Sequence, residues 1–376
     1  MKLTSSIALI TYNGEQFFQR QLESIAQQTR LPDELIICDD CSSDRTVEIA
    51  EEFASTVPFK VRIFQNQTNL SFGLNFRKAF FLAENDITFF CDQDDVWLPE
   101  KIEKTMDCFE KNAAVGMVLS RDIFVDADEK PIKLRNLAKN DDPDNGNSEK
   151  SNSEKSNSEK SNSEKSNSEK QFLETDFPKL LSKGYFQWAA HNMACRTHFR
   201  DALFSNAPPT SVIFDPWVFR CMGALTDVCV LKKPYVLWRK HGDSVTSHSK
   251  HIRNPFKLMY NSIKRHYRID RLVEQALAFQ QTSEFLSKQQ LQHPQIADFY
   301  KGCEHIYKQR IYAIEHPLVR PWIIVKELLS GNFKYSPKGF TEVFMDLFAI
   351  PQTPDWDNYP SEELMTKFNA YDQISK

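Results

Sequence analysis

The chain has 376 residues, of which 41% are apolar and 26% are charged, a composition that is typical of globular proteins and sufficient for a buried core. Forty-seven basic and fifty-one acidic side chains give a net charge of −4, and this balance argues against a nucleic acid as the main partner. No apolar run reaches the roughly 18 residues that a membrane-spanning helix needs, so we expect the chain to stay in the cytosol.

The cysteines and glycines exclude two further classes of site. Eight cysteines at irregular spacing favour reduced thiols over a disulfide framework. Cys38 and Cys41 enclose two aspartates, whereas a redox pair needs a positive environment that lowers its thiol pKa, so a redox role is disfavoured. Neither common glycine-rich phosphate motif is present, and phosphate chemistry would therefore need a metal ion or basic side chains.

The first 120 residues predict strands and helices in alternation. Short runs rich in Ile, Val and Phe are typical of strands buried on both faces, and they cover 6–12, 34–40, 59–65, 87–92 and 115–120. Apolar residues at helical spacing predict helices over 15–28 and 44–54, and a third that Pro99 opens. This order indicates a doubly wound α/β sheet, in which ligands bind beyond the carboxyl ends of the strands.

Composition changes twice along the rest of the chain. Residues 147–170 repeat the motif SNSEK without an apolar side chain, which predicts a disordered insertion inside a first domain of residues 1–250. Residues 251–376 lack the strand pattern and are predicted to be mostly helical. Helical periodicity in this region covers 256–287, 295–315, 320–329 and 337–348.

The clearest chemical signal is the segment FFCDQDDVWLPEK, where an apolar strand ends in Asp92, Asp94 and Asp95. Carboxylates this close repel one another unless a cation lies among them, so the segment predicts a divalent metal site. The alternative is a solvated acidic turn that caps the following helix.

A second signal follows the first two predicted strands. Tyr12 can offer a flat face to a nucleobase, and Asp40 can accept a hydrogen bond from the imide N–H of uracil or thymine. Ser42, Ser43 and Asp44 also suit the start of the next helix, and capping there is compatible with base recognition by Asp40.

Four ordered segments carry a resemblance to a known family. They are SIALITYNGEQFFQRQLESIAQQT, ELIICDDCSSDRT, NLSFGLNFRKAF and ITFFCDQDDVWLPEK. In this order they resemble the nucleotide-binding half of family 2 glycosyltransferases with the GT-A fold, a Rossmann-like mixed sheet flanked by helices. The sequence DQDDVWLP is most similar to bacterial rhamnosyltransferases of cell-surface polysaccharide synthesis. The resemblance covers roughly residues 5–245.

The resemblance implies roles at the donor site. It implies nucleoside contacts for Thr11, Tyr12 and Asp40, and it places Asn69 in the segment that lines the donor pocket. Asp92 and Asp94 correspond to the DxD motif of the family, which binds the sugar-nucleotide diphosphate through Mg²⁺ or Mn²⁺ and has Asp95 beside it here.

The resemblance also implies roles for three later residues. In IFDPWVF, Asp215 stands where the family has its catalytic base, although Phe214 replaces the acidic residue or histidine that often precedes it. Without the resemblance, an N-cap before Pro216 would be the better interpretation of Asp215. In VLWRKHGDSVT, His241 is implied as a further metal or diphosphate contact and Arg239 as a residue near the diphosphate, with tryptophan in place of the usual tyrosine.

These roles imply an inverting, metal-dependent glycosyltransferase. The best donor is dTDP-L-rhamnose, and the acceptor is a hydroxyl of a saccharide or a lipid-linked saccharide. The metal ion would stabilise the departing diphosphate, and a carboxylate would accept the proton of the acceptor hydroxyl. The alternatives are an enzyme of the same fold with a UDP-sugar donor and a catalytically degenerate glycan-binding protein. A haloacid-dehalogenase-type phosphohydrolase is disfavoured because its nucleophile follows the first strand.

Two weaker signals remain open. His191 and Asn192 could line an acceptor pocket, although a histidine in an apolar strand is more often a core residue. Six basic residues and no acidic residue lie between Lys250 and Arg268, on a stretch with one apolar helical face. Such a helix suits either peripheral contact with an anionic membrane at the inner face of the cytoplasmic membrane or packing against the catalytic domain.

Overall fold

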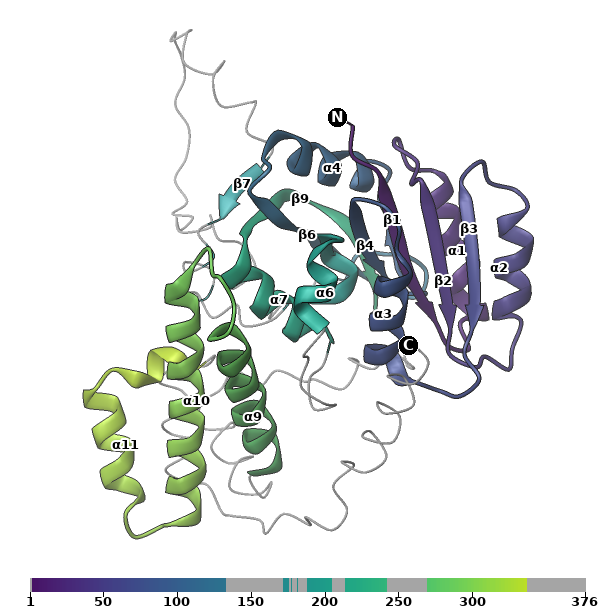
Figure 1. Cartoon of the computed structure of the whole chain (residues 1–376). Helices are drawn as coiled ribbons and strands as arrows, with labels where there is room; N and C mark the ends of the chain where they lie inside the picture. The colour runs from purple at the N-terminus through teal and green to yellow at the C-terminus, as the bar shows by residue number, and fades with distance from the viewer. Residues whose placement is uncertain are drawn as a thin grey trace, which may run out of the picture.

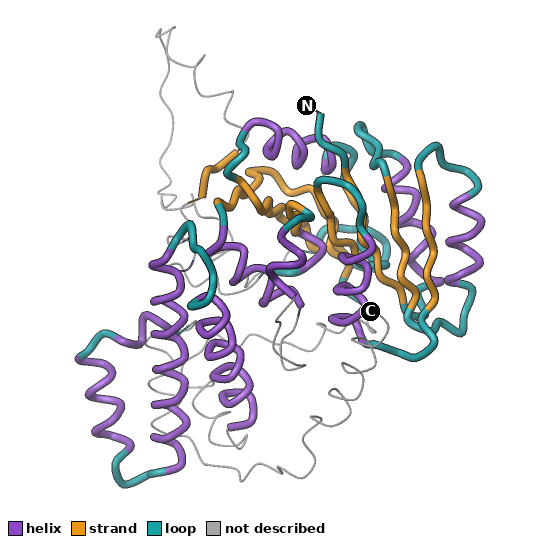
Figure 2. The backbone as a smooth tube through the Cα atoms, in the orientation of Figure 1, coloured by secondary structure: helices purple, strands orange, loops and turns teal. Residues whose placement is uncertain are grey.

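The computed structural model describes residues 2–132, 172–175, 177, 181, 188–204, 214–241 and 269–336. Within these residues, nine strands form one mixed sheet with helices on both faces, and three further helices stand to one side of it (Figures 1 and 2). The α/β class and the helical C-terminal region are thus as predicted. The SNSEK insertion, the basic stretch at 250–268 and the predicted helix at 337–348 lie outside the described residues.

The first half of the sheet is parallel, with the strand order β3-β2-β1-β4. Each bound of these strands lies within one residue of its prediction, because uninterrupted apolar runs mark them clearly. The strands are β1 (Ser5–Thr11), β2 (Glu34–Asp39), β3 (Lys60–Gln65) and β4 (Ile87–Cys91). The helices that connect and follow them are α1 (Glu15–Ala26), α2 (Thr46–Ala54), α3 (Ser71–Leu82) and α4 (Lys101–Lys111).

The second half of the sheet is mixed. Strand β8 (Met193–Arg196) runs antiparallel between β4 and β6 (Val115–Val125), and β9 (Asp227–Arg239) runs parallel to β6. Two short strands, β5 (Val96–Trp97) and β7 (Phe172–Thr175), pair antiparallel with β9. Between β7 and β9 lie η1 (Ala190–Asn192), α6 (Phe199–Phe204) and α7 (Phe214–Leu225).

Alternating side chains of the buried strands build a core on each face of the sheet. Ile7 and Leu9 of β1 point to one face and pack in the cluster that α1, α2 and α4 cover. Ala8 and Ile10 point to the other face and pack with residues of α3 and α7. Side chains alternate between the two faces, and both faces are buried. The residues of such a parallel strand are therefore mostly apolar, and the strand appears in the sequence as a continuous apolar run.

The C-terminal helices attach to the sheet domain through α7. They are α9 (Ile269–Leu286), α10 (Pro294–Glu315) and α11 (Arg320–Leu329), followed by η2 (Asn332–Tyr335). Trp217 of α7 packs against Phe285 of α9 with ring centroids 5.0 Å apart, and the backbone N–H of His293 donates to the carbonyl of Ala224. None of the helices in the described ranges combines the length and apolarity that crossing a membrane requires.

Candidate active site

The loops after β1 and β2 interlock at the carboxyl edge of the sheet. Asn13 and Cys41, the second residues after these strands, have positive φ angles of 47° and 67°. Asn13 donates its N–H to Oγ of Ser42 and accepts the N–H of Ser43 on its side-chain oxygen, both at 2.8 Å. Non-glycine residues in the left-handed region are costly and concentrate at functional sites, so this edge is the first place to look for chemistry.

Gln93 ties the acidic loop after β4 to the end of β1. Its side-chain oxygen accepts the N–H of Tyr12 at 2.8 Å, and its side-chain nitrogen donates to the carbonyl of Tyr12 at 3.0 Å. Gly14 leaves space for this amide, because a Cβ at that position would lie 2.3 Å from Oε1 of Gln93. The three predicted aspartates are therefore held beside the residues that were predicted to contact a nucleoside.

Asp40 is the centre of a hydrogen-bonded group next to Tyr12. Its carboxylate oxygen Oδ1 accepts hydrogen bonds from the side chain of Asn66 at 2.8 Å and from the N–H of Leu70 at 2.7 Å. Asn69 donates to its carbonyl at 3.3 Å. Tyr12, with half of its surface exposed, stands at the end of the adjacent strand. Asp40 and Asn69 thus lie in contact beside the end of β1, and the predicted roles of Asp40, Asn69 and Tyr12 in a donor pocket stay predictions.

Thr11 lies at the same edge but has a different environment. Its hydroxyl is buried and donates to Oδ1 of Asp39 at 2.8 Å, across the pair of strands β1 and β2. Asp39 also accepts the N–H of Ser42 at 2.9 Å. These contacts make Thr11 a link between the two strand ends, and its predicted contact with a nucleoside stays a prediction.

Asp94 pairs with His241, and their predicted role as metal ligands stays a prediction. His241 Nε2 lies 2.8 Å from Asp94 Oδ2, and the imidazole ring packs on Phe17 at a centroid distance of 4.8 Å. The two side chains remain partly open, with 26% of Asp94 and 14% of His241 exposed. Residues that are 147 positions apart in the sequence therefore meet at the end of β4.

Arg239 contacts the acidic loop through both its side chain and its backbone. Its guanidinium donates to the carbonyl of Asp94 at 2.9 Å, pairs with Glu129 at 3.2 Å and lies over the ring of Phe17. Its backbone N–H donates to Oδ1 of Asp95 at 3.2 Å. Because Arg239 is 2% exposed and its guanidinium already bonds to the protein, the described geometry gives it a structural role, and its predicted position near a diphosphate is untested.

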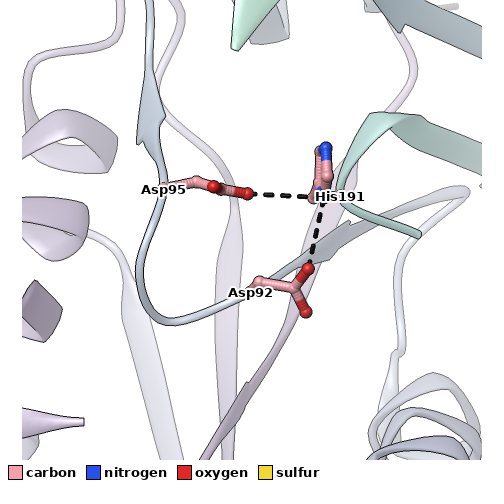
Figure 3. A group of neighbouring side chains, drawn as sticks. All are labelled: Asp92, Asp95 and His191. Carbon is pink, nitrogen blue, oxygen red and sulfur yellow. Dashed lines mark hydrogen bonds and ion pairs between the residues drawn. The ribbon is translucent and has the colours of Figure 1, made fainter. Parts of the chain in front are cut away.

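His191 lies at the centre of three carboxylates (Figure 3). Its Nδ1 atom is 3.2 Å from Asp92 Oδ2 and 3.4 Å from Asp95 Oδ2, and its Nε2 atom is 3.3 Å from Asp122 Oδ1. Burial lowers the pKa of His191, but the carboxylates of Asp95 and Asp122 outweigh burial and hold it well above its usual value. Each ring nitrogen of His191 thus faces at least one carboxylate, which favours the protonated imidazole and places His191 to orient the carboxylates.

Two further buried ionisable groups adjoin His191. Burial raises the pKa of Asp95 to about 8 against the opposing charge of His191, and the nearby charges of Asp94 and Asp92 raise it further. Burial lowers the pKa of Lys101 to about 8, and its ammonium donates to the carbonyl of His191 at 2.6 Å. Charges removed from water cost several kcal/mol unless they are paired, and clusters with such shifts occur preferentially at functional sites.

Asp215 faces this cluster from the first turn of α7, so it is not the residue that precedes the helix. Burial, followed by the charge of Asp92, raises the pKa of Asp215 to about 6. Its Oδ1 atom is buried and has no hydrogen-bond partner among the described residues. Phe214, which departs from the family pattern, is a core residue that stacks on Phe76 at 5.3 Å and so anchors the start of α7.

The donor atoms at this edge fit a divalent cation. Asp92 and Asp94 present carboxylate oxygens on side chains that are 34% and 26% exposed, and His241 adds an imidazole nitrogen. Oxygen and imidazole ligands suit Mg²⁺ or Mn²⁺. Asp95, His191 and Asp92 also lie within 4.8 Å of one another, but both nitrogens of His191 already face carboxylates, so we assign it to positioning.

Comparison with known proteins gives a family match for the N-terminal part of the chain. Residues 6–171 match the family model described as glycosyl transferase family 2. This part of the chain belongs to glycosyltransferase family 2. The observed mixed sheet with its flanking helices is GT-A like, as the resemblance in the sequence implied.

The two curated relatives named here match this chain over less than half of their own length. A glycosyltransferase of Nostoc sp., described as uncharacterised, is 30% identical over 128 residues, which cover 34% of this chain and 39% of that protein. RfbG of Shigella flexneri, described as a dTDP-rhamnosyl transferase, is 36% identical over 110 residues, which cover 28% of this chain and 38% of RfbG. Residues 1–349 of S. aureus TarS, solved with UDP-GlcNAc, are 18% identical, with a TM-score of 0.48 and 91% of this chain covered against 90% of that chain.

Sequence analysis missed three residues of the site. Asp122 lies on β6, beyond the predicted end of that strand at residue 120, and accepts a hydrogen bond from Asn192 at 2.7 Å. Lys101 is a buried cation on a helix whose other charges face solvent, and only its lack of exposure distinguishes it. Asn66 follows directly after β3, so the rule that functional residues follow strand ends would have found it.

Proposed function

We propose that the chain is an inverting, metal-dependent glycosyltransferase that uses a pyrimidine-nucleotide sugar. The single observation that supports this most is the contact of 2.8 Å between His241 and Asp94, a residue of the loop that follows β4. The acceptor is a hydroxyl of a saccharide or a lipid-linked saccharide in bacterial surface polysaccharide synthesis. dTDP-L-rhamnose is the first candidate donor, which the description of RfbG supports, and a UDP-sugar is the second.

The edge of the sheet that carries Asp92 and Asp94, here called the acidic edge, would bind the diphosphate of the donor. Asp92, Asp94 and His241 would hold Mg²⁺ or Mn²⁺, which supplies charge stabilisation for the departing nucleoside diphosphate. His191 would keep the carboxylates of Asp92 and Asp95 in position through its Nδ1 atom, which lies 3.2 and 3.4 Å from them. Arg239, through its bond to the carbonyl of Asp94, fixes the loop on the other side.

The nucleoside would lie over the ends of β1 and β2. Tyr12 offers an exposed aromatic face, and Asp40 offers a carboxylate that Asn66 and Leu70 hold in one orientation. A fixed acceptor suits the imide N–H of thymine or uracil and rejects cytosine, which has no proton on that ring nitrogen. Asn69, bonded to the carbonyl of Asp40, completes this side of the pocket.

Asp215 would act as the catalytic base. A carboxylate whose pKa is raised to about 6 is still ionised at neutral pH and is a stronger proton acceptor than an ordinary aspartate. Removal of the proton from the acceptor hydroxyl lets the oxygen attack the anomeric carbon as the diphosphate leaves. One displacement inverts the configuration at that carbon, and no glycosyl-enzyme intermediate forms.

A panel of dTDP-, UDP- and GDP-sugars tests the proposed donor. We expect slow, metal-dependent hydrolysis of a dTDP- or UDP-sugar, because the imide N–H of thymine or uracil can donate to Asp40, and dTDP-L-rhamnose is the first candidate. Preference for a GDP-sugar would contradict the pyrimidine assignment. Tight nucleotide binding without turnover of any donor, in the presence of acceptor, would favour the degenerate glycan-binding alternative.

The pH dependence of transfer tests the role of Asp215. We expect kcat/KM to fall below about pH 6, because a protonated carboxyl cannot accept a proton, and to be flat above that value. Metal affinity measured at each pH separates this effect from loss of the cation. An acid limb close to the ordinary aspartate value of 3.8 would show that a different group limits the rate.

Replacement of His191 tests the positioning role. In His191→Ala, the carboxylates of Asp92 and Asp95 lose their common partner, and we expect Mn²⁺ affinity, read by electron paramagnetic resonance, to fall about 10- to 100-fold, as for other residues that orient ligands. His198→Ala, at an exposed histidine outside the cluster, is the matched control. Unchanged Mn²⁺ affinity in a folded His191→Ala protein would refute the role.

A further inference from the structure

Helix α11 buries two charged side chains and exposes apolar ones. Its charged residues Arg320 and Glu327 are 7% and 2% exposed, whereas Trp322 and Leu329 are 78% and 83% exposed. A surface helix of a globular protein normally buries its apolar stripe and turns its charges to water. The outward face of α11 therefore needs an explanation other than the folding of this chain.

Specific contacts fix this orientation. The guanidinium of Arg320 donates to the carbonyls of Ala313 and Ile314, at 3.0 and 2.9 Å, and so binds the last turn of α10. Glu327 accepts a hydrogen bond from Asn332 at 2.6 Å and lies 3.2 Å from Nε2 of His305. Because both buried charges have partners, rotation of α11 to bury its apolar residues would break these contacts.

The outward apolar residues lie along α11 and in the turn before it. Trp322, Val325 and Leu329 are spaced by three and four positions, which places them on one helical face, and Leu318 lies two residues before the helix begins. The exposed fractions are 95% for Leu318 and 78%, 46% and 83% for the three helical residues. We call these four residues the α11 stripe. Figure 1 shows α11 on the outer side of α10, away from the sheet.

The exposed charges along α11 are basic. Between Leu318 and Lys334, the exposed ionised side chains are Lys326 and Lys334, and the one carboxylate in this range, Glu327, is buried. The nearest exposed acid before this range is Glu315, three residues ahead of Leu318. Lys326 follows Trp322 by four positions and precedes Leu329 by three, so it borders the stripe. Tryptophan and leucine next to lysine is the composition of helices that lie in the interface of an anionic bilayer.

The small size of the stripe argues against a second copy of the chain as the occupant. A stable protein interface buries about 800 Å² on each partner and uses roughly 20 residues a side. Four side chains on and just before a helix of ten residues fall far short of this. A bilayer needs no such area, because a few inserted apolar side chains and nearby cations are enough for reversible binding.

We propose that the α11 stripe docks on an anionic lipid surface. Trp322 and the three aliphatic residues enter the headgroup boundary, and Lys326 and Lys334 stay at the level of the lipid phosphates. This contact is separate from the basic stretch at 250–268, and it does not depend on the donor site or on the identity of the donor.

Co-sedimentation of the full chain with vesicles tests the proposal. We expect binding to vesicles that contain phosphatidylglycerol, weaker binding to phosphatidylcholine alone, and weakening by salt. The triple variant Leu318→Gln, Trp322→Gln, Leu329→Gln should bind at least about 10-fold more weakly, because it loses most of the inserted apolar surface. The matched control Leu31→Gln, Leu277→Gln, at two exposed leucines outside the stripe, should bind as the wild type does.

Three results would overturn the proposal. The first is equal vesicle binding by the triple variant and the wild type, and the second is the absence of binding by the wild type. The third is a dimer in sedimentation analysis that the triple variant loses, which would make a second copy the occupant. Nucleotide binding by the triple variant is measured in parallel and should be unchanged, so failure of the docking proposal and failure of the proposed function give different results.

Discussion

Asp94→Ala is expected to lower transfer by about 10³-fold or more, at the upper end of the effect for loss of one electrostatic contact in an active site. It should also remove nearly all metal-dependent donor binding. The change deletes one proposed metal ligand, which is also the partner of His241. Calorimetric titration with the nucleotide sugar, with and without Mn²⁺, measures the loss directly.

The matched control for this variant is Asp298→Ala, at an exposed aspartate on α10. This variant also removes one carboxylate, at a position far along the chain from the acidic edge. It should leave turnover unchanged. Turnover of Asp94→Ala within a few fold of the wild type, in a protein with the same unfolding midpoint, would refute Asp94 as a ligand.

Asp215→Asn is expected to cut turnover by about 10² or more, the effect typical of losing a general base. Donor affinity should stay within a few fold, because the side chain keeps its volume and lies on the acceptor side of the proposed reaction. Single-turnover kinetics with a saturating donor separates the chemical step from binding. Equal losses in donor affinity and in turnover would point to a structural role for Asp215.

The same variant is expected to be more stable than the wild type. Because the folded-state pKa of Asp215 is raised from 3.8 to about 6, the folded protein holds this proton more tightly than the unfolded chain does. Stability therefore falls as the pH rises from about 4 to about 6, and the ionised group costs about 3 kcal/mol above that range. Asparagine removes the cost at pH 7.5 and changes little at pH 4. Urea unfolding at both pH values measures the difference, and a destabilised variant at pH 7.5 would contradict it.

The sequence predicted the parallel half of the sheet well and the mixed half poorly. Strands β1 to β4 are continuous apolar runs, and only a buried strand of this length explains such runs between helical segments. Strand β9 was missed because its run is interrupted by Lys232, Lys233 and Pro234, which stand at its exposed middle. Helix α3 was missed as a helix because it starts at Ser71 with a positive φ and contains Gly73.

The candidate site was predictable where it is local in sequence. Asp92, Asp94 and Asp95 are adjacent in the chain, and their repulsion is visible without a structure. The cations that offset this repulsion come from elsewhere in the chain, since Lys101 lies on α4 and His191 on η1, and a further carboxylate, Asp122, comes from β6. Their convergence depends on the pairing of β4 and β6 with β8, and no local pattern encodes that register.

Titration of the wild-type protein with dTDP by calorimetry, in the presence and absence of Mn²⁺, tests the central claim that this sheet edge is a metal-dependent site for a pyrimidine nucleoside diphosphate. We expect binding that needs Mn²⁺, that is lost in Asp94→Ala and weakened in Asp40→Asn, and that is at least about 5-fold tighter for dTDP than for CDP, because one misplaced hydrogen bond costs at least about 1 kcal/mol. Binding of dTDP with the same affinity without a divalent cation, or equal affinity for CDP, would contradict the account.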